Sequence, residues 1–389
     1  MALATLTRFG FLFLVFCSAY SMTAQKTVCN HQSYPPPDKD KVDTVVIDLD
    51  LEPEERWKDI TLKKKPEILA LAKEIKNFTS FIFDGKLFDY VDKFLPILMR
   101  SLPDPYGREI KGISSATGIP LGEILLFNIF YELTVACTSI IAETPSGKLF
   151  HARNLDFGLF DGWDVRTNTW AMAEALRPLV LNFDFQRKGK TVYITTGFPG
   201  FVGAFTGFRP GEITITMNSR FSTAGGKIGL LEWIMGERDS HWTTFLVRNV
   251  LDSGVGFDDA EKLLSNTKTL APCYYLLGGN SSGQGMIISR SRTKSLYPLS
   301  MDQGKSGWYL LQTNYDHWKN PLIIDDRRTP GNECMEEMTQ TNVGFKGIFN
   351  VLSTIPVLNK LTSYTAIMHV STGEVRTYRR YCRDPCFPW

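Results

Sequence analysis

The chain has 389 residues, of which 43% are hydrophobic and 22% are charged, proportions typical of folded globular proteins. Its formal net charge of +2, with no basic cluster longer than Lys63–Lys65, argues against a nucleic-acid partner. The length allows one large domain or two ordinary ones.

The N-terminus has the composition of a secretory signal peptide. Arg8 precedes an apolar core that begins at Phe9, and small residues follow up to Ala24, the order found in signal peptides. We expect residues 1–24 to be removed and the mature chain to enter the secretory pathway. Sequons at Asn77 and Asn280 agree with this route and predict glycosylated surface positions.

Residues 57–132 have helical periodicity. Within 66–78 the apolar residues recur at spacings of three and four, which predicts one apolar helix face. The segments 88–99 and 120–130 continue this pattern. We therefore predict a small helical unit with several apolar faces.

After Cys137 the pattern changes to strands separated by glycine-rich turns. Strands are predicted at 137–143, 148–154, 179–186, 191–198 and 212–220, helices at 230–236, 243–251 and 258–267, and further strands at 273–279, 285–292, 307–315, 362–370 and 374–380. Strands on both sides of a helical block predict an α+β sandwich of two sheets covered by helices. The glycine-rich run 197–211 lacks the lysine–hydroxyl pair of a phosphate loop and predicts tight turns.

The first two of these strands predict a β-hairpin. A turn centred on residues 145–146 places Thr138 opposite Arg153 and Cys137 opposite Asn154. A slip of one or two residues still leaves Arg153 close to the cysteine.

Cys137 is a candidate nucleophile because of its predicted neighbours. A guanidinium such as that of Arg153 favours the thiolate and is expected to lower the pKa of the thiol; Asp156 follows on the same strand. The simpler interpretation is that Cys137 is a small core residue and that Arg153 and Asp156 form a structural ion pair. Neither interpretation is excluded by the pattern alone.

A thiol nucleophile also needs a base. His151 lies on the same face of its predicted strand as Arg153, so a Cys–His pair is one option, although no papain-type or caspase-type signature surrounds Cys137. The other option is a cut just before Cys137. Such a cut frees an α-amine with a pKa of about 7.7–8.0 within reach of its own side chain.

Cysteine usage agrees with an oxidising compartment, in which exposed cysteines tend to pair. Cys382 and Cys386 are close enough for a small C-terminal loop, and Cys29 and Cys334 lie in polar segments that allow a long-range pair. Cys273 lies in an apolar run and is expected to be a buried free thiol. Cys137 is left without a partner.

Ordered motifs along the whole mature chain resemble those of the choloylglycine-hydrolase type of N-terminal nucleophile amidases. The motifs are CTSIIAE, GKLFHARNLDFG, MNSRF, LGGN, QTNYDHW, DDRRTP and VLSTIPVLNKLTSYT. The resemblance implies a helical α subunit from residues 25–136 and a catalytic β subunit from residues 137–389 with an αββα sandwich. It also implies a precursor that cuts itself between Ala136 and Cys137, and no metal or organic cofactor.

The resemblance carries the family's catalytic residues onto six positions: Cys137, Arg153, Asp156, Asn218, Asn314 and Arg327. It implies that the α-amine of Cys137 takes the thiol proton, that the two asparagines hold the oxyanion by side chain or adjacent backbone N–H, and that Asp156 orients the amine. The two arginines stabilise local negative charge. The same resemblance implies two disulfides, Cys29 with Cys334 between the subunits and Cys382 with Cys386 near the C-terminus. Ser219 stands where the family often has an acidic residue, so no role for that side chain follows.

The activity implied by this resemblance is hydrolysis of ceramide to sphingosine and a fatty acid in the lysosome lumen, with secretion as a second destination. The implied partners are ceramide, the second subunit of a disulfide-linked α/β heterodimer, a saposin-type activator and anionic lysosomal lipids. The alternative within the family is an acid amidase that hydrolyses N-acylethanolamines. A non-catalytic lipid-binding module is the alternative from another class, and it would need none of the six residues together.

Overall fold

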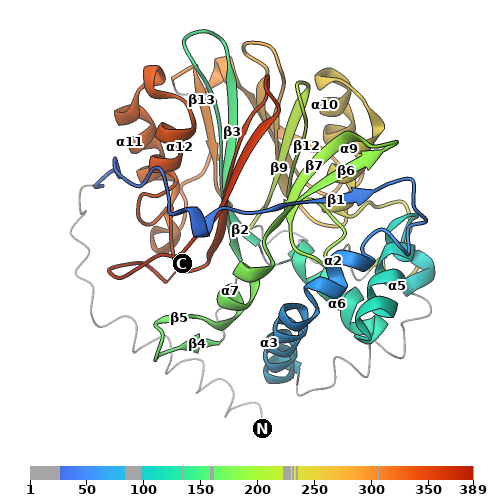
Figure 1. Cartoon of the computed structure of the whole chain (residues 1–389). Coiled ribbons are helices and arrows are strands. Elements are labelled where there is room, and N and C mark those ends of the chain that lie inside the picture. Colours follow the sequence, from blue (N-terminus) through green and yellow to red (C-terminus); the bar gives the residue numbers. More distant parts are fainter. Residues whose placement is uncertain are drawn as a thin grey trace.

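The computed structural model of the chain describes residues 27–83, 98–133, 135–157, 162–221, 229, 232–233, 235–304 and 306–388 (Figure 1). The predicted signal peptide lies outside the described residues. So do residues 88–97 of the helix predicted at 88–99 and residues 230, 231 and 234 of the helix predicted at 230–236.

Two β-sheets packed against each other form the centre of the molecule (Figure 1). The larger sheet has the strand order β1-β6-β7-β8-β9-β10-β11-β12, and the smaller has the order β13-β2-β3-β14-β15. The strands of the larger sheet are β1 (Thr44–Asp48), β6 (Leu181–Arg187), β7 (Lys190–Gly197), β8 (Thr206–Arg209), β9 (Ile213–Ser219), β10 (Cys273–Gly278), β11 (Gly285–Arg290) and β12 (Ser295–Ser300). Those of the smaller sheet are β13 (Tyr309–Gln312), β2 (Val135–Glu143), β3 (Leu149–Phe157), β14 (Thr362–His369) and β15 (Glu374–Arg379).

Helices cover the outer face of each sheet. The helices α9 (Thr243–Ser253) and α10 (Phe257–Asn266) pack on the larger sheet, and α11 (Arg328–Met338) and α12 (Phe345–Val351) pack on the smaller one. The layers therefore run helix, sheet, sheet, helix. This confirms the predicted α+β class and the αββα sandwich.

The segment before the hairpin is helical, as its periodicity predicts. Its described helices are α2 (Lys58–Lys63), α3 (Lys65–Phe83), α5 (Tyr106–Thr117) and α6 (Leu121–Leu133). In α3 the predicted apolar face is buried, with Ile68 and Ile75 each 1% exposed. No helix in the described part of the chain is long and apolar enough to cross a membrane.

One strand of the N-terminal segment was not predicted. β1 pairs in parallel with β6, so that Val45 lies opposite Phe183 and the segment supplies the edge of the larger sheet. Only Ile47 of its five residues is buried, and a single buried position gives no clear alternation in the sequence. The N-terminal segment therefore joins the sandwich through a sheet as well as through helices.

The register of the β2–β3 hairpin differs by one residue from the prediction. Cys137 lies opposite Leu155 because the loop has three residues between Thr144 and Lys148, whose backbone groups pair at 2.9 Å. Gly147 in this loop has a φ of 76°, the left-handed residue that closes a three-residue hairpin loop. The prediction placed the turn centre half a residue too early.

The cysteines pair as the sequence and the family resemblance indicate. Disulfides join Cys29 to Cys334 and Cys382 to Cys386. Cys273 is a buried free thiol, as predicted, and Cys137 is also buried and free.

Candidate active site

Cys137 lies on the inner face of β2, between the two sheets. Its side chain is fully buried, and its sulfur contacts Nη2 of Arg153 and lies 4.0 Å from the carbonyl oxygen of Met217 on β9. Ser139 points the same way, as alternate residues of a strand do, and it lies opposite Arg153 in place of the predicted Thr138. The shifted register still brings Arg153 to the sulfur.

The charged side chain of Arg153 is fully buried. Nη1 donates to the carbonyl oxygens of Phe205 at 2.7 Å and Met217 at 3.1 Å. Within the described residues Arg153 forms no ion pair with a carboxylate, and its Nε has no hydrogen-bond partner. A buried cation without a counter-ion is costly, so Arg153 by itself lowers the cost of negative charge on the sulfur or on a bound group.

The expectation of a lowered thiol pKa is wrong for the intact chain. Burial raises the pKa of Cys137 to about 11, although the Arg153 and Arg327 guanidinium groups act in the opposite direction. Loss of water around the sulfur outweighs the two positive charges because the thiol is completely enclosed. The Cys137 thiol of the intact chain is therefore protonated at neutral and acidic pH.

His151 is not placed to act as the base for Cys137. Its ring nitrogens bond to the hydroxyls of Thr214 at 2.8 Å and Thr216 at 2.9 Å, across the sheet interface. Burial lowers the pKa of His151 to about 3. In the described part of the chain the Cys137 sulfur has no hydrogen bond to a histidine or a carboxylate.

Asn314 and Arg327 hold the backbone of Cys137. The Cys137 N–H donates to Oδ1 of Asn314 at 2.9 Å, and Arg327 Nη1 donates to the Cys137 carbonyl oxygen at 2.8 Å. Arg327 Nη2 also donates to Oδ1 of Asn314 at 2.8 Å, while Nδ2 of Asn314 donates to the Ser219 carbonyl oxygen at 2.8 Å. In these contacts the Asn314 amide oxygen faces the Cys137 nitrogen and its amide nitrogen faces the Ser219 carbonyl oxygen.

Asp156 lies on the opposite face of β3 from Arg153. It is opposite Ala136 on β2 and Thr362 on β14. Its carboxylate is fully buried, pairs with Arg327 Nη1 at 3.1 Å and accepts a hydrogen bond from the Thr362 hydroxyl at 2.6 Å. Burial raises the pKa of Asp156, and Arg327 and Thr362 partly oppose this shift.

Asn218 links β9 to the smaller sheet. Its Oδ1 accepts from the Ser139 hydroxyl at 2.8 Å, and its Nδ2 donates to the carbonyl oxygens of Gln312 and Thr313 at 3.0 and 3.3 Å. Within the part of the chain that the structure describes, the Ser219 hydroxyl is buried without a hydrogen-bond partner, and it lies on the other face of β9. Five of the six residues identified in the sequence thus lie in one buried network of contacts around Cys137, and Asn218 lies beside it with its own bonds to the smaller sheet.

Two residues of this network were not identified from the sequence. Asp325 binds Arg327 Nε at 2.7 Å and accepts a hydrogen bond from the Tyr315 hydroxyl at 2.9 Å. Thr362 holds Asp156, as described above. The adjacent acidic pair before Arg327 was a usable signal for Asp325, whereas a threonine at the start of a strand carries no signal of its own.

Asn77 and Asn280 are the two predicted glycosylation sites. Asn280 is exposed in the turn between β10 and β11, and the side chain of Asn77 lies outside the described residues, so glycosylation stays a prediction. Among the described residues no group of His, Cys, Asp or Glu side chains is arranged to hold a metal ion.

The four-layer sandwich, with a cysteine at the start of the central hairpin strand, defines the class of N-terminal nucleophile hydrolases. A sequence model described as linear amide C–N hydrolases, choloylglycine hydrolase family, matches residues 137–381. A second model, described as the beta subunit of N-acylethanolamine-hydrolyzing acid amidase, matches residues 40–102. The chain belongs to the choloylglycine hydrolase family and is an amide hydrolase.

Individual relatives agree with this assignment. Acid ceramidases of Balaenoptera acutorostrata scammoni and Homo sapiens are each 47% identical over 365 residues, which cover 93% of this chain and 92% of the relative. Among solved structures, the Caenorhabditis elegans N-acylethanolamine-hydrolyzing acid amidase ortholog matches with a TM-score of 0.52 and 29% identity. That match covers 63% of this chain and 100% of the other.

Proposed function

We propose that the chain is the precursor of a lysosomal amidase that hydrolyses ceramide to sphingosine and a fatty acid. Cys137 is the nucleophile in this proposal, and it becomes N-terminal when the bond between Ala136 and Cys137 is cut. The curated relatives named acid ceramidase support the substrate. The family model that begins at Cys137 supports the position of the cut.

The observation that carries the proposal is that every polar atom of Cys137 has a dedicated partner. Arg153 contacts its sulfur, Asn314 accepts its N–H, and Arg327 donates to its carbonyl oxygen. A core cysteine needs no cation at its sulfur, and its backbone groups are ordinarily bonded within the sheet and not to the side chains of an asparagine and an arginine. A residue that supplies both nucleophile and base needs its sulfur, nitrogen and carbonyl held in fixed positions.

The proposed cut is an attack of the Cys137 sulfur on the carbonyl carbon of Ala136. The bond from that carbon to the Cys137 nitrogen breaks, and the nitrogen takes the proton that the thiol loses. Water then hydrolyses the thioester, which releases the Ala136 carboxyl group and restores the thiol. The products are an α subunit that ends at Ala136 and a β subunit that begins at Cys137.

Turnover of the lipid amide repeats the same chemistry on a new carbonyl. The free amine of Cys137 takes the thiol proton, the sulfur attacks the amide, and the resulting ammonium protonates the departing sphingosine nitrogen. Asn314 Oδ1, which already accepts from this nitrogen at 2.9 Å, orients the amine, and Arg153 stabilises the thiolate. Water hydrolyses the acyl-thioester and frees the fatty acid.

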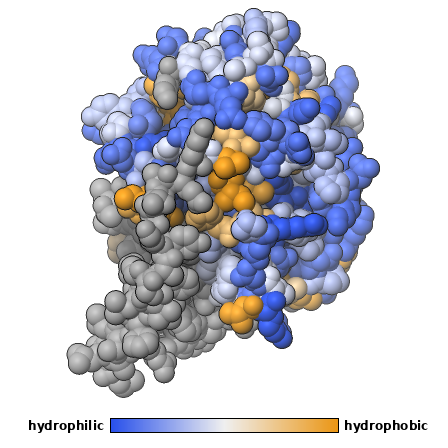
Figure 2. Space-filling view, turned by 90° about the vertical axis from the view of Figure 1, so that its left-hand side faces the viewer, coloured by the Kyte–Doolittle hydropathy of each residue, from blue (hydrophilic) through white to orange (hydrophobic). Residues whose placement is uncertain are grey.

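An apolar surface next to the site suits a lipid substrate. Leu322, Ile323 and Ile324, which directly precede Asp325, are 59%, 76% and 65% exposed. Exposed contiguous aliphatic side chains commonly mark a ligand or partner surface. The molecular face at the left of Figure 1 is largely hydrophilic where it is coloured, with a few local hydrophobic patches (Figure 2).

The assembly in this proposal is a disulfide-linked α/β heterodimer in the lysosome lumen. The Cys29–Cys334 bond joins residues from the two sides of the proposed cut. The signal peptide and the sequons support passage through the secretory pathway, and secretion is a second destination. A saposin-type activator and anionic lysosomal lipids are further proposed partners.

Hydrolysis of N-acylethanolamines is the second candidate, because the solved relative and the model matched at residues 40–102 carry that description. The test compares ceramide and an N-acylethanolamine as substrates for the wild-type chain and for Cys137→Ala. We expect faster hydrolysis of ceramide, no turnover by Cys137→Ala, and labelling of Cys137 by a thiol-reactive acyl probe. Preference for the N-acylethanolamine would reject the ceramidase assignment, and an active Cys137→Ala variant would reject the nucleophile.

A further inference from the structure

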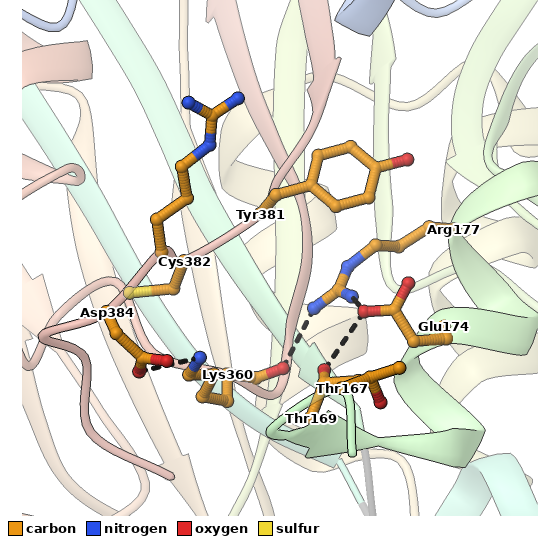
Figure 3. Close-up of a pocket in the computed structure, with 9 residues that line it drawn as sticks. Thr167, Thr169, Glu174, Arg177, Lys360, Tyr381, Cys382 and Asp384 are labelled. Atoms are coloured by element: carbon orange, nitrogen blue, oxygen red, sulfur yellow. Dashed lines mark hydrogen bonds and ion pairs between the residues drawn. The ribbon is translucent and has the colours of Figure 1, made fainter. Parts of the chain in front are cut away.

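A polar pocket lies between the segment 167–177, the turn at Lys360 and the C-terminal disulfide loop. Its volume is about 270 Å³, and it is lined by Thr167, Thr169, Glu174, Arg177, Lys360, Tyr381, Cys382, Arg383 and Asp384. Figure 3 shows Arg177 reaching from one wall toward Lys360, with Asp384 on the far side of Lys360. Lys360 belongs to the turn 359–362. Thr362, at the end of this turn, donates its hydroxyl to Asp156 on β3.

Arg177 follows the short helix α7 (Ala171–Leu176) and is 2% exposed. Its Nη2 donates to the carbonyl oxygens of Lys360 at 2.8 Å and Thr362 at 3.3 Å. Its Nη1 pairs with Glu174. The guanidinium fork therefore clamps the two carbonyl groups on either side of Leu361, which only a planar group with several donors can do.

The clamped turn presents the hydroxyl of Thr362 to Asp156. The backbone N–H of Asn359 donates to Oγ1 of Thr362 at 3.1 Å, which leaves the hydroxyl proton for Asp156 at 2.6 Å. The carbonyl oxygen of Leu361 accepts from the N–H of Phe157, the residue after Asp156, at 3.0 Å. The turn is thus tied to β3 on both sides of the carboxylate.

The C-terminal disulfide loop supports the same turn from the other side. Lys360 Nζ pairs with Asp384 at 2.9 Å, and the Lys360 N–H donates to the Phe387 carbonyl oxygen at 3.0 Å. Asp384 lies inside the loop closed by Cys382 and Cys386.

We infer that Arg177 is a positioning residue for the hydrolytic site, because it fixes the Thr362 hydroxyl on the Asp156 carboxylate. The inference rests on the proposed function, in which Cys137 reacts while Arg327, the ion-pair partner of Asp156, donates to its carbonyl oxygen. A continuous series of contacts leads from Arg177 through Thr362 and Asp156 to Arg327, which holds the Cys137 carbonyl oxygen. No atom of Arg177 takes part in the reaction itself.

The consequence is a change in the pH dependence of activity. Three titratable or charged groups act on Asp156: Arg327 at the start of α11, Asp325 just before it and Cys137 on β2. The hydrogen bond from Thr362 lowers the pKa of the carboxyl group, so its loss raises that pKa. The carboxylate then protonates at higher pH, and the acid limb of the activity profile moves upward.

The test is the pH profile of ceramide hydrolysis by Arg177→Met, Thr362→Val and the double variant, made as full-length chains. For Arg177→Met we expect about a tenfold lower kcat, a KM within about twofold of wild type, and an acid limb higher by about one pH unit. Thr362→Val should show the same shift, and Thr362→Ser should restore the wild-type profile. The double variant should equal Thr362→Val alone, because the two changes act through one contact.

Arg209→Met is the matched control. Arg209 is 4% exposed, pairs with Glu212 three residues later and donates to the carbonyl oxygen of Val255 at 2.9 Å, but it has no contact with the turn. Arg209→Met should lower thermal stability without moving the acid limb of the pH–activity profile. If Arg177→Met does not fold, Arg177→Lys replaces it, with a smaller shift in the same direction because one ammonium cannot hold both carbonyl groups.

Two outcomes overturn the inference. The first is an acid limb of the activity profile that stays in place in the Arg177 variant but moves in Thr362→Val. The second is a shift in the double variant that equals the sum of the two single-variant shifts. Cys137→Ala, assayed in parallel, separates this failure from that of the proposed function: if it retains activity, the proposed function fails, whereas an inactive Cys137→Ala restricts the failure to Arg177.

Discussion

Cys137 combines full burial with polar contacts at its sulfur, nitrogen and carbonyl oxygen. The sequence located this residue and the side chains around it because short motifs carry them: Arg153 and Asp156 lie in one strand, and Arg327 in DDRR. The raised pKa of the thiol could not be predicted, because it depends on complete enclosure by both sheets. The role of Asn314 also depends on which way its amide points, and a sequence does not contain that information.

The first prediction concerns Asn314. Asn314→Ala removes the acceptor for the Cys137 N–H and one partner of Arg327. We expect the cut before Cys137 to slow by about 10²-fold, because a small displacement of a reacting group costs about that much. The measurement is the fraction of cut chain over time on a denaturing gel.

Asn182→Ala is the control for this change. Asn182 is 3% exposed and accepts hydrogen bonds from Thr196 and Thr377 far from Cys137. Asn182→Ala should be less stable than wild type, but the bond before Cys137 should be cut at the wild-type rate. Normal cutting by Asn314→Ala would show that Asn314 does not position the nucleophile.

The second prediction concerns stability at acidic pH. The pKa of His151 is lowered from 6.5 to about 3 in the folded chain, so below pH 6.5 the unfolded chain binds the extra proton and folding stability decreases as pH falls. The contribution is on the order of 1.4 kcal/mol per pH unit until the folded pKa is reached. His151→Gln should remove this slope, so its stability relative to wild type should improve as pH decreases in chemical denaturation.

His151→Gln also tests the Cys–His alternative. Gln retains one donor and one acceptor for Thr214 and Thr216, so the variant should keep cutting and hydrolysis. Complete loss of both activities in a folded variant would make His151 the catalytic base after all.

At the scale of elements, the strands that the sequence predicts are present because buried β-strands are short apolar runs between turn residues. Besides β1, the larger sheet contains two strands that were not predicted: β8, which lies inside the glycine-rich run 197–211 expected to form tight turns, and β12. The missed elements have physical reasons. α7 and β1 are too short to show periodicity, and α11 contains Pro330 and Gly331, which argue against a helix in a sequence. The predicted register of the β2–β3 hairpin was wrong by one residue because Gly147 adopts a left-handed conformation that sets the loop length.

The third prediction concerns the attachment of α5 to α9. Glu109 is fully buried and binds Arg248 through both oxygens, at 2.5 and 2.7 Å, and it also accepts from the Trp57 indole at 2.8 Å. Glu109→Gln leaves a buried guanidinium without its counter-ion, which costs about 3 kcal/mol. The expected result is a lower Tm in thermal unfolding with unchanged position of the cut.

Glu109→Leu combined with Arg248→Met is the comparison for this variant. Removing both charges avoids an unpaired Arg248, and Arg56, which also pairs with Glu109 at 3.2 Å, keeps its bonds to the carbonyl oxygens of Leu49 and Leu51. The double variant should therefore be more stable than Glu109→Gln. Equal instability of the two would mean that packing, not the ion pair, dominates at this position.

The molecule as a whole is one packing unit built from the segments on both sides of Cys137. A single buried cluster contains Ile68 of α3, Ile113 of α5, Phe183 of β6, Phe245 of α9 and Cys137 itself. The edge strand β1 and the Cys29–Cys334 bond add a sheet contact and a covalent link. The two-segment organisation was indicated by the change in periodicity, but this shared core was not, because long-range packing leaves no local pattern.

The fourth prediction follows from the covalent link. After cutting, wild-type chain should run as one species on a non-reducing denaturing gel and as two after reduction. Cys29→Ser should give two species without reductant, while Cys382→Ser, which opens only the C-terminal loop, should keep one. A single non-reduced species from cut Cys29→Ser would show that another bond joins the segments.

The central claim is that Cys137 becomes the first residue of a catalytic subunit, and N-terminal sequencing of the mature protein tests it most directly. The account predicts two sequences, one from the processed N-terminus and one that begins Cys-Thr-Ser-Ile, with the second absent from Cys137→Ala. A hydrolytically active wild-type protein with no chain beginning at Cys137 would contradict it.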